Sequence, residues 1–306
     1  MSSRYSTGFV SATYNPLLNP DAPTIGTATA GGGQISITFT APSIVGGSAI
    51  TSYIATARKT SDGTTVTATG ASSPIVITGL SLVAYTVRVA AVNSSGASAL
   101  SAASNSATPT EPAPTVIGQT YGGGFYAGQI GVSSVATHYL VIGPVASAEN
   151  GSRQWKTTNT TTTGTSSDID GPTNSANMNN ASHPAAQFCE GLTIGGFSDW
   201  YMPAKNELEV CYYNLKPTTT SNNTNTGINA NAVPARASNY TTGTPAQTSA
   251  TDFRSTGAED FSLADYWSST EHSATYAWLQ GFSNGARGYY IKNLSTRVRA
   301  IRRVAV

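Results

Sequence analysis

Residues 85–92 read YTVRVAAV. Apolar side chains occupy every second position of this stretch, namely Tyr85, Val87, Val89 and Ala91. Thr86 and Arg88 stand between them. A period of two residues places the apolar side chains on one face of a β-strand and the polar ones on the other. The stretch therefore predicts a strand that buries one face in a core.

Similar stretches recur upstream at short intervals. They read QISITFT at 34–40, ITSYIATA at 50–57 and IVI at 75–77. Turn signals separate or follow them, at Gly31-Gly32-Gly33, Gly46-Gly47, Asp62-Gly63 and Ser95-Gly96. Several short strands with regularly spaced turns predict a β-sandwich.

The leading PDAP and the stretches GGSAITSYIATA and ITGLSLVAYTVRVAAVNSSG resemble a fibronectin type III domain over residues 21–103. The resemblance implies that Tyr85 is the tyrosine-corner residue of that fold. Phe39 stands where the family usually has a buried tryptophan, and the spacing from Leu80 to Tyr85 is one residue short. Such domains are usually spacers or binding modules, so this one indicates an extended surface protein and no particular chemistry.

Two segments flank this domain without a core of their own. Residues 1–20 form an arm whose larger side chains are too few to build a core, so we expect them to dock into a partner. These side chains are Arg4, Tyr5, Phe9, Val10 and Tyr14. Residues 104–117, SNSATPTEPAPTVI, are rich in proline and predict a semi-rigid linker.

The remainder, residues 118–306, mixes helical and strand patterns. Apolar residues recur at helical spacing over 177–192, although Pro184 interrupts the pattern, and again over 205–215. Residues 218–250 are a Thr-, Asn- and Ala-rich loop that we expect to wrap on its own domain or on a neighbour.

Three motifs in this part of the chain follow one another in a specific order. They are GGFSDWYMPAKNELEV at 195–210, YWSSTEHSATYAW at 266–278 and VRAIRR at 298–303. In this order they resemble the C-terminal domain family of the Legionella collagen-like protein, in a form similar to versions found in phage virion structural proteins. The resemblance implies a C-type-lectin-like domain. The expected fold class is therefore β-rich with two domains, a fibronectin type III β-sandwich followed by an α+β C-type-lectin-like domain.

The last 41 residues, 266–306, contain a polar stretch studded with aromatic residues. Tyrosine supplies amphipathic contact area at low entropic cost, and Ser, Asn and Gly supply adaptable hydrogen bonds. Related lectin-like domains carry diversified ligand loops of this composition, and residues 271–295 resemble such a region. The expected ligand contacts are Glu271, His272, Asn284, Arg287, Tyr289, Tyr290 and Asn293. The alternative is that these residues form ordinary exposed loops.

Other conspicuous residues of the domain are expected to be structural. Trp200, Trp267 and Trp278 are expected in the core, where large aromatic rings contribute most. Asp199 and Asn206 are expected to cap and tie the second helix.

Catalysis and metal binding are not favoured by the motifs. Ser268-Ser269-Thr270 lacks the strand-turn-helix elbow of a nucleophile and an identifiable base. Asp168-Ile169-Asp170-Gly171 hints at a calcium loop, but its glycine is misplaced and no bidentate glutamate follows. Cys189 and Cys211 are expected as thiols, with a disulfide as the alternative. We therefore expect no catalytic residue, no metal and no cofactor.

Charge and hydropathy limit the classes of partner that we expect for this protein. Only 10% of residues are charged and the net charge is +1, so no global field attracts nucleic acid or an anionic membrane. No stretch approaches the roughly 20 apolar residues of a membrane span. The cluster Arg297–Arg303 is expected to form a solvated strand face or internal salt bridges, with a phosphate site as the alternative.

These observations favour a virion surface protein of a tailed phage, acting in capsid decoration, as a head fibre or as a tail fibre. Met1-Ser2-Ser3-Arg4 is not followed by the apolar stretch of a secretory signal, so we expect synthesis in the host cytoplasm and location in the virion. The arm would bind capsid or tail proteins, and the lectin-like domain would adhere to a host glycan or protein. A homo-oligomer such as a trimer is expected for avidity. The alternatives are a bacterial surface adhesin and a relative of formylglycine-generating enzymes.

Overall fold

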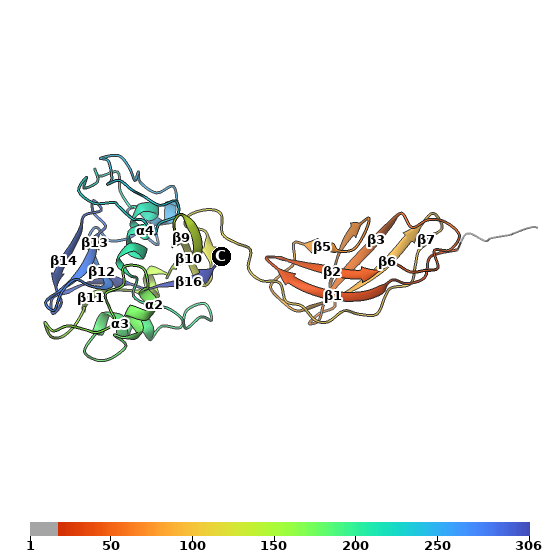
Figure 1. The fold of residues 1–306 in the computed structure, drawn as a ribbon, viewed down its shortest axis with the longest axis horizontal. Helices are drawn as coiled ribbons and strands as arrows, with labels where there is room; N and C mark the ends of the chain where they lie inside the picture. Colours follow the sequence, from red (N-terminus) through yellow and green to blue (C-terminus); the bar gives the residue numbers. More distant parts are fainter. Residues whose placement is uncertain (1–17) are drawn as a thin grey trace, which may run out of the picture. The chain divides into compact units, whose positions relative to one another are not determined.

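The computed structural model describes residues 18–306. The chain divides into two compact units between Ala113 and Pro114 (Figure 1). The residues expected to anchor the chain, Arg4, Tyr5, Phe9, Val10 and Tyr14, lie outside the described residues. No helix within residues 18–306 has the length and apolar character needed to span a membrane.

The first unit is a β-sandwich, as predicted. One sheet has the order β1-β2-β5, with β1 at Thr24–Gly31, β2 at Gln34–Thr40 and β5 at Ile75–Thr78. The other has the order β4-β3-β6-β7, with β4 at Thr65–Gly70, β3 at Ser52–Lys59, β6 at Tyr85–Asn93 and β7 at Gly96–Ala97. Neighbouring strands are antiparallel in both sheets.

The predicted alternation in β6 is confirmed. Tyr85 and Val87 are buried in the core between the two sheets, whereas Arg88 is exposed. The Tyr85 hydroxyl accepts a hydrogen bond from the Ser81 backbone N–H at 3.2 Å. A tyrosine corner makes this kind of bond to backbone a few residues upstream, so Tyr85 has the role that the resemblance implied.

The segment after β7 stays attached to the sandwich beyond residue 103. Three serines in this segment, Ser98, Ser101 and Ser104, are spaced three residues apart. Their backbone N–H groups donate to β6 carbonyls at 2.8–2.9 Å. Each serine hydroxyl also accepts a β6 N–H at 2.9–3.0 Å. Ala107 and Thr110 continue the row with backbone hydrogen bonds to the sandwich. Residues 104–117 were expected as linker, but the part up to Thr110 is bound to the first unit.

The second unit contains two further sheets. The first has the order β16-β10-β9-β8, with β16 at Ile301–Ala305, β10 at Val135–Ile142, β9 at Gly124–Val132 and β8 at Thr120–Tyr121. The second has the order β11-β15-β12-β13-β14, with β11 at Glu149–Gln154, β15 at Ser295–Arg299, β12 at Asp265–Glu271, β13 at Tyr276–Gly281 and β14 at Arg287–Ile291. The last two strands of the chain thus each pair with a strand from the start of this unit. The β-rich, two-unit architecture expected from the sequence is confirmed.

Five short helical segments connect the strands of the second unit. They are α1 (Val145–Ala148), α2 (Gly171–Ala176), α3 (Pro184–Glu190), α4 (Lys205–Leu215) and the 3-10 helix η1 (Thr251–Phe253). Helix α4 packs against β9 and β10 on one side and against β12 and β13 on the other (Figure 1).

The helix predicted over 205–215 is confirmed, whereas the one predicted over 177–192 is wrong in its first half. Helix α2 ends at Ala176, and the next helix begins only at Pro184. Proline lacks an N–H and clashes with the preceding turn, so it is tolerated at the start of a helix and not in its interior.

Two of the three predicted core tryptophans are confirmed. Trp200 and Trp267 are fully buried, but Trp278 is partly exposed, so its prediction was wrong. The neighbours of Trp278 on β13, Ala277 and Leu279, are buried. Successive side chains of a strand point to opposite faces, so Trp278 must point away from that core.

The C-terminal arginines form internal salt bridges, as the first interpretation predicted. Their partners are carboxylates of the same unit, of which only Asp199 is exposed: Arg297 pairs with Glu149, Arg299 with Glu149 and Glu259, Arg302 with Asp199, and Arg303 with Glu207. Asp199 is therefore held by an arginine, and its predicted role as a cap of α4 is wrong. The α4 backbone is capped by Glu207, whose carboxylate accepts the Ala204 N–H at 2.7 Å. Asn206 does tie the helix, to Asn231 at 2.9 Å.

The remaining conspicuous residues lie inside the fold. Cys189 and Cys211 are buried free thiols, and burial raises the pKa of both. Ser268 and Ser269 are buried as well. Asp170 caps α2 by accepting the Thr173 N–H at 3.3 Å. No group of three or more His, Cys, Asp or Glu residues within the described part of the chain is placed to hold a metal ion.

The loop over 218–250 wraps on its own unit. Ala232 and Tyr240 from this loop lie in the core beside α4. The Asn222 side chain donates to the Thr241 and Pro245 carbonyls at 3.1 and 2.9 Å, which ties the two ends of the loop together.

Candidate functional site

Four aromatic side chains gather on one face of the sheet at β13 and β14. We call His272, Tyr276, Trp278 and Tyr289 the aromatic surface. The His272 and Tyr289 rings are stacked, with centroids 4.0 Å apart and planes 12° apart. Tyr276 and Trp278 meet the Tyr289 ring edge-on at 5.4 and 5.8 Å. Tyr289 is nevertheless 51% exposed, so the group presents ring area to solvent.

The strand register explains why these rings meet. Trp278 lies opposite Tyr289 in the antiparallel pair β13–β14, and residues paired in this way point to the same face. The turn before β13 is held by the Tyr276 carbonyl, which accepts the backbone N–H groups of His272 and Ser273, each at 3.0 Å. The rings are therefore carried on a hydrogen-bonded scaffold.

A cation supports the aromatic surface from α4. The Lys205 ammonium lies 4.6 Å from the centroid of the Trp278 ring. It also forms an ion pair with Asp168 at 2.6 Å. A cation over an indole face is attracted by the ring's electrons, which helps to fix the orientation of Trp278.

A cavity of about 300 Å³ adjoins the aromatic surface at Trp278. Arg287 lines it together with residues of the 218–250 loop, which are Asn225, Thr226, Gly227, Ile228 and Asn239. The terminal nitrogens of Arg287 reach the Asn206 side-chain oxygen and the Ile228 carbonyl only at 3.5 Å. Its Nε is buried without a hydrogen-bond partner within residues 18–306. Arg287 thus has spare donor capacity beside the cavity.

Buried polar contacts hold the loop that forms this cavity. The Glu209 carboxylate of α4 is fully buried, pairs with Arg236 and accepts hydrogen bonds from Asn229 and Tyr240. Burial, together with the Glu209 charge, raises the pKa of the Tyr240 hydroxyl, which therefore stays a donor. These contacts to one buried carboxylate position the loop from within its own unit.

The structure brings only some of the predicted contact residues together. His272 and Tyr289 lie in the aromatic surface, and Arg287 lies two positions before Tyr289 on the same face of β14. Tyr290 points to the opposite face, with its ring 6.4 Å from that of Trp267. Asn293 is exposed in the turn after β14.

Two predicted contacts are engaged inside the unit. The Glu271 carboxylate pairs with the buried Lys292 ammonium and accepts the Thr162 N–H at 2.9 Å. Burial lowers the pKa of Lys292, and the hydrogen bond that its ammonium donates to Glu271 offsets part of that effect. The Asn284 side chain accepts the Ala286 N–H at 3.1 Å and so shapes the turn between β13 and β14.

The sequence interpretation missed Tyr276 and Trp278. Both alternate with Ala277 and Leu279 in the stretch YAWL, and that period of two residues is the signal that places them on the outer face. The part that the 218–250 loop plays in the cavity had no comparable signal in the sequence.

The second unit matches a known protein family. The profile of the Lcl C-terminal domain matches residues 149–302. The chain belongs to the Lcl C-terminal domain family. The matched residues run from the first residue of β11 into β16, so they include the whole aromatic surface and its cavity.

Solved structures that resemble this Lcl-domain protein cover about a third of it. A structure of titin kinase and its flanking domains is 24% identical over 30% of this chain and 17% of that chain, with a TM-score of 0.27. The FN5 domain of Drosophila Lar is 22% identical over 31% of this chain and 99% of that chain, with a TM-score of 0.25. A human fourth FNIII domain is 25% identical over 37% of this chain and 98% of that chain, with a TM-score of 0.28. The present chain thus spans about a sixth of the titin kinase structure. The search of curated proteins found no match.

Proposed function

We propose that this protein is a virion surface protein of a tailed phage that adheres to a host-surface glycan or protein. In this proposal the second unit is a C-type-lectin-like binding domain and the β-sandwich is a spacer. The aromatic surface, with Arg287 and the adjoining cavity, is the contact site. The protein is proposed to act by binding and not by catalysis.

The observation that carries the proposal is the exposed stack of His272 on Tyr289. Exposed aromatic rings held on a rigid sheet supply contact area at a low entropic cost on binding. Arg287 and the amides of the neighbouring loop add directional hydrogen bonds beside the rings. Ring faces next to a small polar cavity suit a ligand with both apolar and hydroxyl or amide groups.

The binding role is tested with the full chain and intact host cells or their purified envelope. We expect the double variant His272→Ala/Tyr289→Ala to lower the affinity at least tenfold, and Trp278→Ala to do the same. Tyr290→Ala is the matched control, because Tyr290 has similar exposure but faces the other side of β14. Equal affinity of the double variant and the unaltered protein would overturn the assignment of the site.

The virion location is tested separately, by labelling purified phage particles with an antibody to the second unit. Label at the head or tail supports it and distinguishes the two positions. Unlabelled particles, together with label on bacterial cells, would instead favour the bacterial adhesin.

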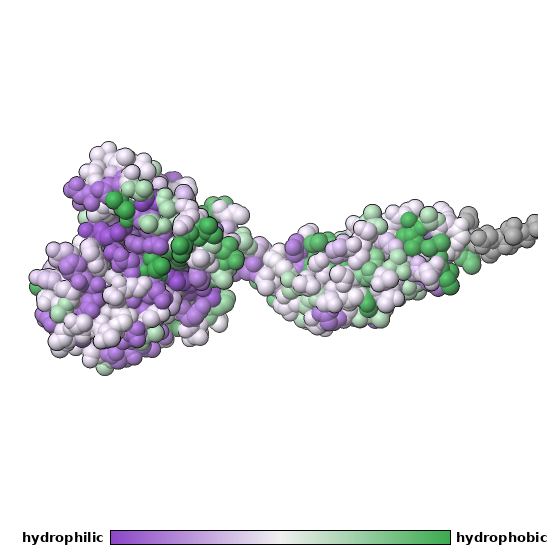
Figure 2. Space-filling view, in the orientation of Figure 1, coloured by the Kyte–Doolittle hydropathy of each residue, from purple (hydrophilic) through white to green (hydrophobic). Residues whose placement is uncertain are grey.

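A homo-oligomer, such as a trimer, is part of the proposal. Hydrophobic residues gather over β9 and β10 on the visible face of the second unit (Figure 2). Val132 and Val135, paired across this hairpin, are 58% and 68% exposed. Exposed apolar patches often mark protein contacts. We expect light scattering to give a mass above that of one chain and Val135→Lys to reduce it; a monomer at all concentrations contradicts this part.

A further inference from the structure

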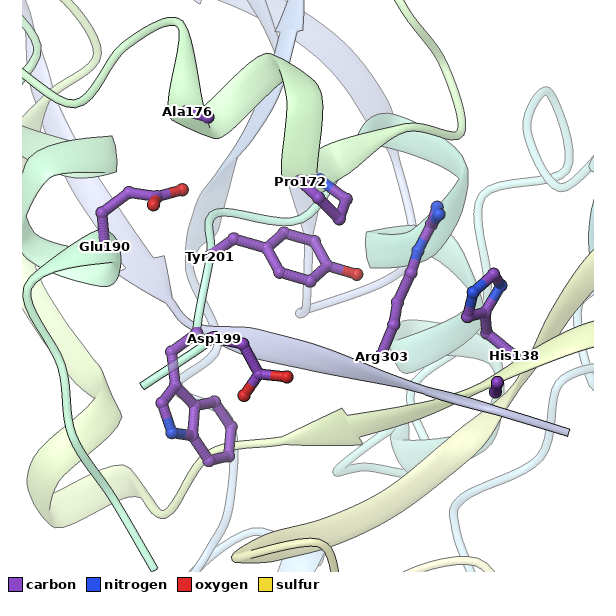
Figure 3. A pocket seen from close by; sticks show the side chains of 9 residues that line it. His138, Pro172, Ala176, Glu190, Asp199, Tyr201 and Arg303 are labelled. Atoms are coloured by element: carbon purple, nitrogen blue, oxygen red, sulfur yellow. The ribbon is translucent and has the colours of Figure 1, made fainter. Parts of the chain in front are cut away.

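A second and larger cleft, of about 500 Å³, lies in the second unit (Figure 3). It is lined from α2 by Pro172 and Ala176, from the end of α3 by Glu190, from the following loop by Asp199 and from β16 by Arg303. None of the residues that line it belongs to the aromatic surface or to the cavity beside Trp278. The cleft is therefore a separate feature from the proposed adhesion site.

Most of the charges in this cleft are already neutralised by partners. The Asp199 carboxylate receives two hydrogen bonds from the Arg302 guanidinium, at 2.7 and 2.9 Å. The Arg303 guanidinium donates to the buried Glu207 carboxylate at 2.6 Å. An arginine–carboxylate pair of this kind leaves little net charge for a ligand to meet.

Glu190 is the exception. Within residues 18–306 it forms no ion pair, and its one favourable partner is the Ser175 hydroxyl. Burial raises the pKa of Glu190 because the carboxylate loses water without gaining a cation. On the other side of the cleft, burial and the nearby Arg303 lower the pKa of His138, which is therefore neutral at pH 7. Glu190 is thus a carboxyl group of the cleft without a cationic partner among the described residues.

The walls next to Glu190 are apolar. Pro172 and Ala176 present a ring and a methyl group from α2, and Trp200 also lines the cleft. Figure 3 shows the Glu190 carboxylate on one side of the Tyr201 ring and Arg303 and His138 on the other, with the Asp199 carboxylate below the ring. An aliphatic stem fits between such walls, with a charged head at the carboxylates.

We propose that this cleft binds an aliphatic primary ammonium group, as carried by a lysine side chain, with Glu190 as its counter-ion. An anion would meet two carboxylates there and find both arginines already paired. A metal ion is disfavoured because no group of three or more His, Cys, Asp or Glu residues in the described chain is placed to hold one. A neutral ligand would leave the Glu190 charge as unfavourable as before. The ammonium comes from a free amine or from a lysine of a partner chain.

Titration of the full, isotope-labelled chain with three probes tests the proposal by NMR. The probes are the pentylammonium ion, acetyl-Gly-Lys-Gly-amide and the uncharged acetyl-Gly-norleucine-Gly-amide. We expect the lysine peptide to shift the amide resonances of Ala176 and Glu190, and the norleucine peptide to leave them in place. Binding by pentylammonium as well shows that the cation alone suffices, whereas binding by the peptide alone shows that the ligand is a lysine in a polypeptide. If neither charged probe binds, the proposal is overturned.

Two substitutions test whether the charged probes bind in this cleft. Glu190→Gln should weaken binding of the charged probes at least tenfold. Ala176→Lys should abolish it, because the new ammonium reaches Glu190 from the exposed end of α2 and occupies the cleft. Gln187→Lys is the matched control, since Gln187 is exposed on α3 and does not line the cleft. If Glu190→Gln fails to fold, Ala176→Lys still tests whether the probes bind in this cleft, because Ala176 is exposed. Unchanged binding in Ala176→Lys would sink the proposal.

Discussion

The imidazole of His272 lies face to face with the phenol ring of Tyr289, at 4.0 Å between centroids. His272 follows β12 and Tyr289 belongs to β14, so the contact spans the whole width of the β12–β13–β14 hairpins. The stack therefore fixes the turn after β12 relative to the far strand. It is both a structural contact and an exposed surface.

This stack should be measurable as a coupling energy. We expect a double-mutant cycle of His272→Ala and Tyr289→Ala to give about 0.5–1.5 kcal/mol, the usual worth of an aromatic pair beyond the area it buries. Urea denaturation of the four proteins measures it. The pair His272 and Tyr290, on opposite faces of the sheet, should give a coupling near zero. Equal coupling in both cycles would contradict a direct ring contact.

Arg299 should be far more important to stability than its neighbour Arg297. Arg299 is fully buried, donates to the Gly143 carbonyl at 2.9 Å and pairs with Glu259 at 2.7 Å. Arg299→Met would leave the largely buried Glu259 carboxylate without a cation, at a cost of about 3–5 kcal/mol. Arg297→Met, where the side chain is 33% exposed, should cost about 1 kcal/mol or less. Unfolding free energies of the two variants provide the test, and similar losses in both would refute it.

His183 should make the second unit sensitive to acid. Burial, with smaller effects of Lys156 and Lys292, lowers the pKa of His183 to about 4. Both ring nitrogens are engaged, with Thr162 and Asn180, at 2.9 Å each. The unfolded chain, with a histidine pKa near 6.5, binds the proton more readily, so this contribution is complete above about pH 6.5 and falls as the pH drops toward 4.

A substitution of His183 separates its effect on the pH dependence of stability from that of other titratable groups. His183→Gln cannot take up the proton, so its unfolding free energy should depend less on pH between 6.5 and 4 than that of the unaltered protein. The difference in slope is at most about 1.4 kcal/mol per pH unit. Urea denaturation at several pH values measures it, and parallel curves for the two proteins would exclude His183 as the source.

The serine row at the edge of β6 should contribute to the stability of the first unit. The Ser101 hydroxyl accepts the Val89 N–H at 2.9 Å in a buried position. Ser101→Ala leaves that N–H without its partner, at a cost of about 1–3 kcal/mol. Ser106→Ala, at an exposed position, should change stability by no more than about 0.5 kcal/mol. Thermal unfolding of both variants is the measurement, and an unaffected Ser101→Ala would show that water replaces the hydroxyl.

The sequence alone determined the features that depend on local periodicity. The two-residue alternation of 85–92 identified a half-buried strand, and the helical spacing of 205–215 identified α4 to the residue. The motifs at 195–210, 266–278 and 298–303 identified the domain family. In each case the side-chain pattern repeats the geometry of the backbone element, so no distant contact is needed to read it.

Only the tertiary structure decided which polar and aromatic residues remain available for binding. From the sequence, Glu271 and Tyr289 are equally good candidates for ligand contacts. In the structure Glu271 forms an ion pair with Lys292, whereas Tyr289 is half exposed. The pairing of Asp199 with Arg302 is likewise invisible in the sequence, because the two residues are 103 positions apart. The same holds for Glu190, since only the fold shows that no cation within residues 18–306 pairs with it. Local pattern sets the direction in which a side chain points, but long-range packing decides what it meets there.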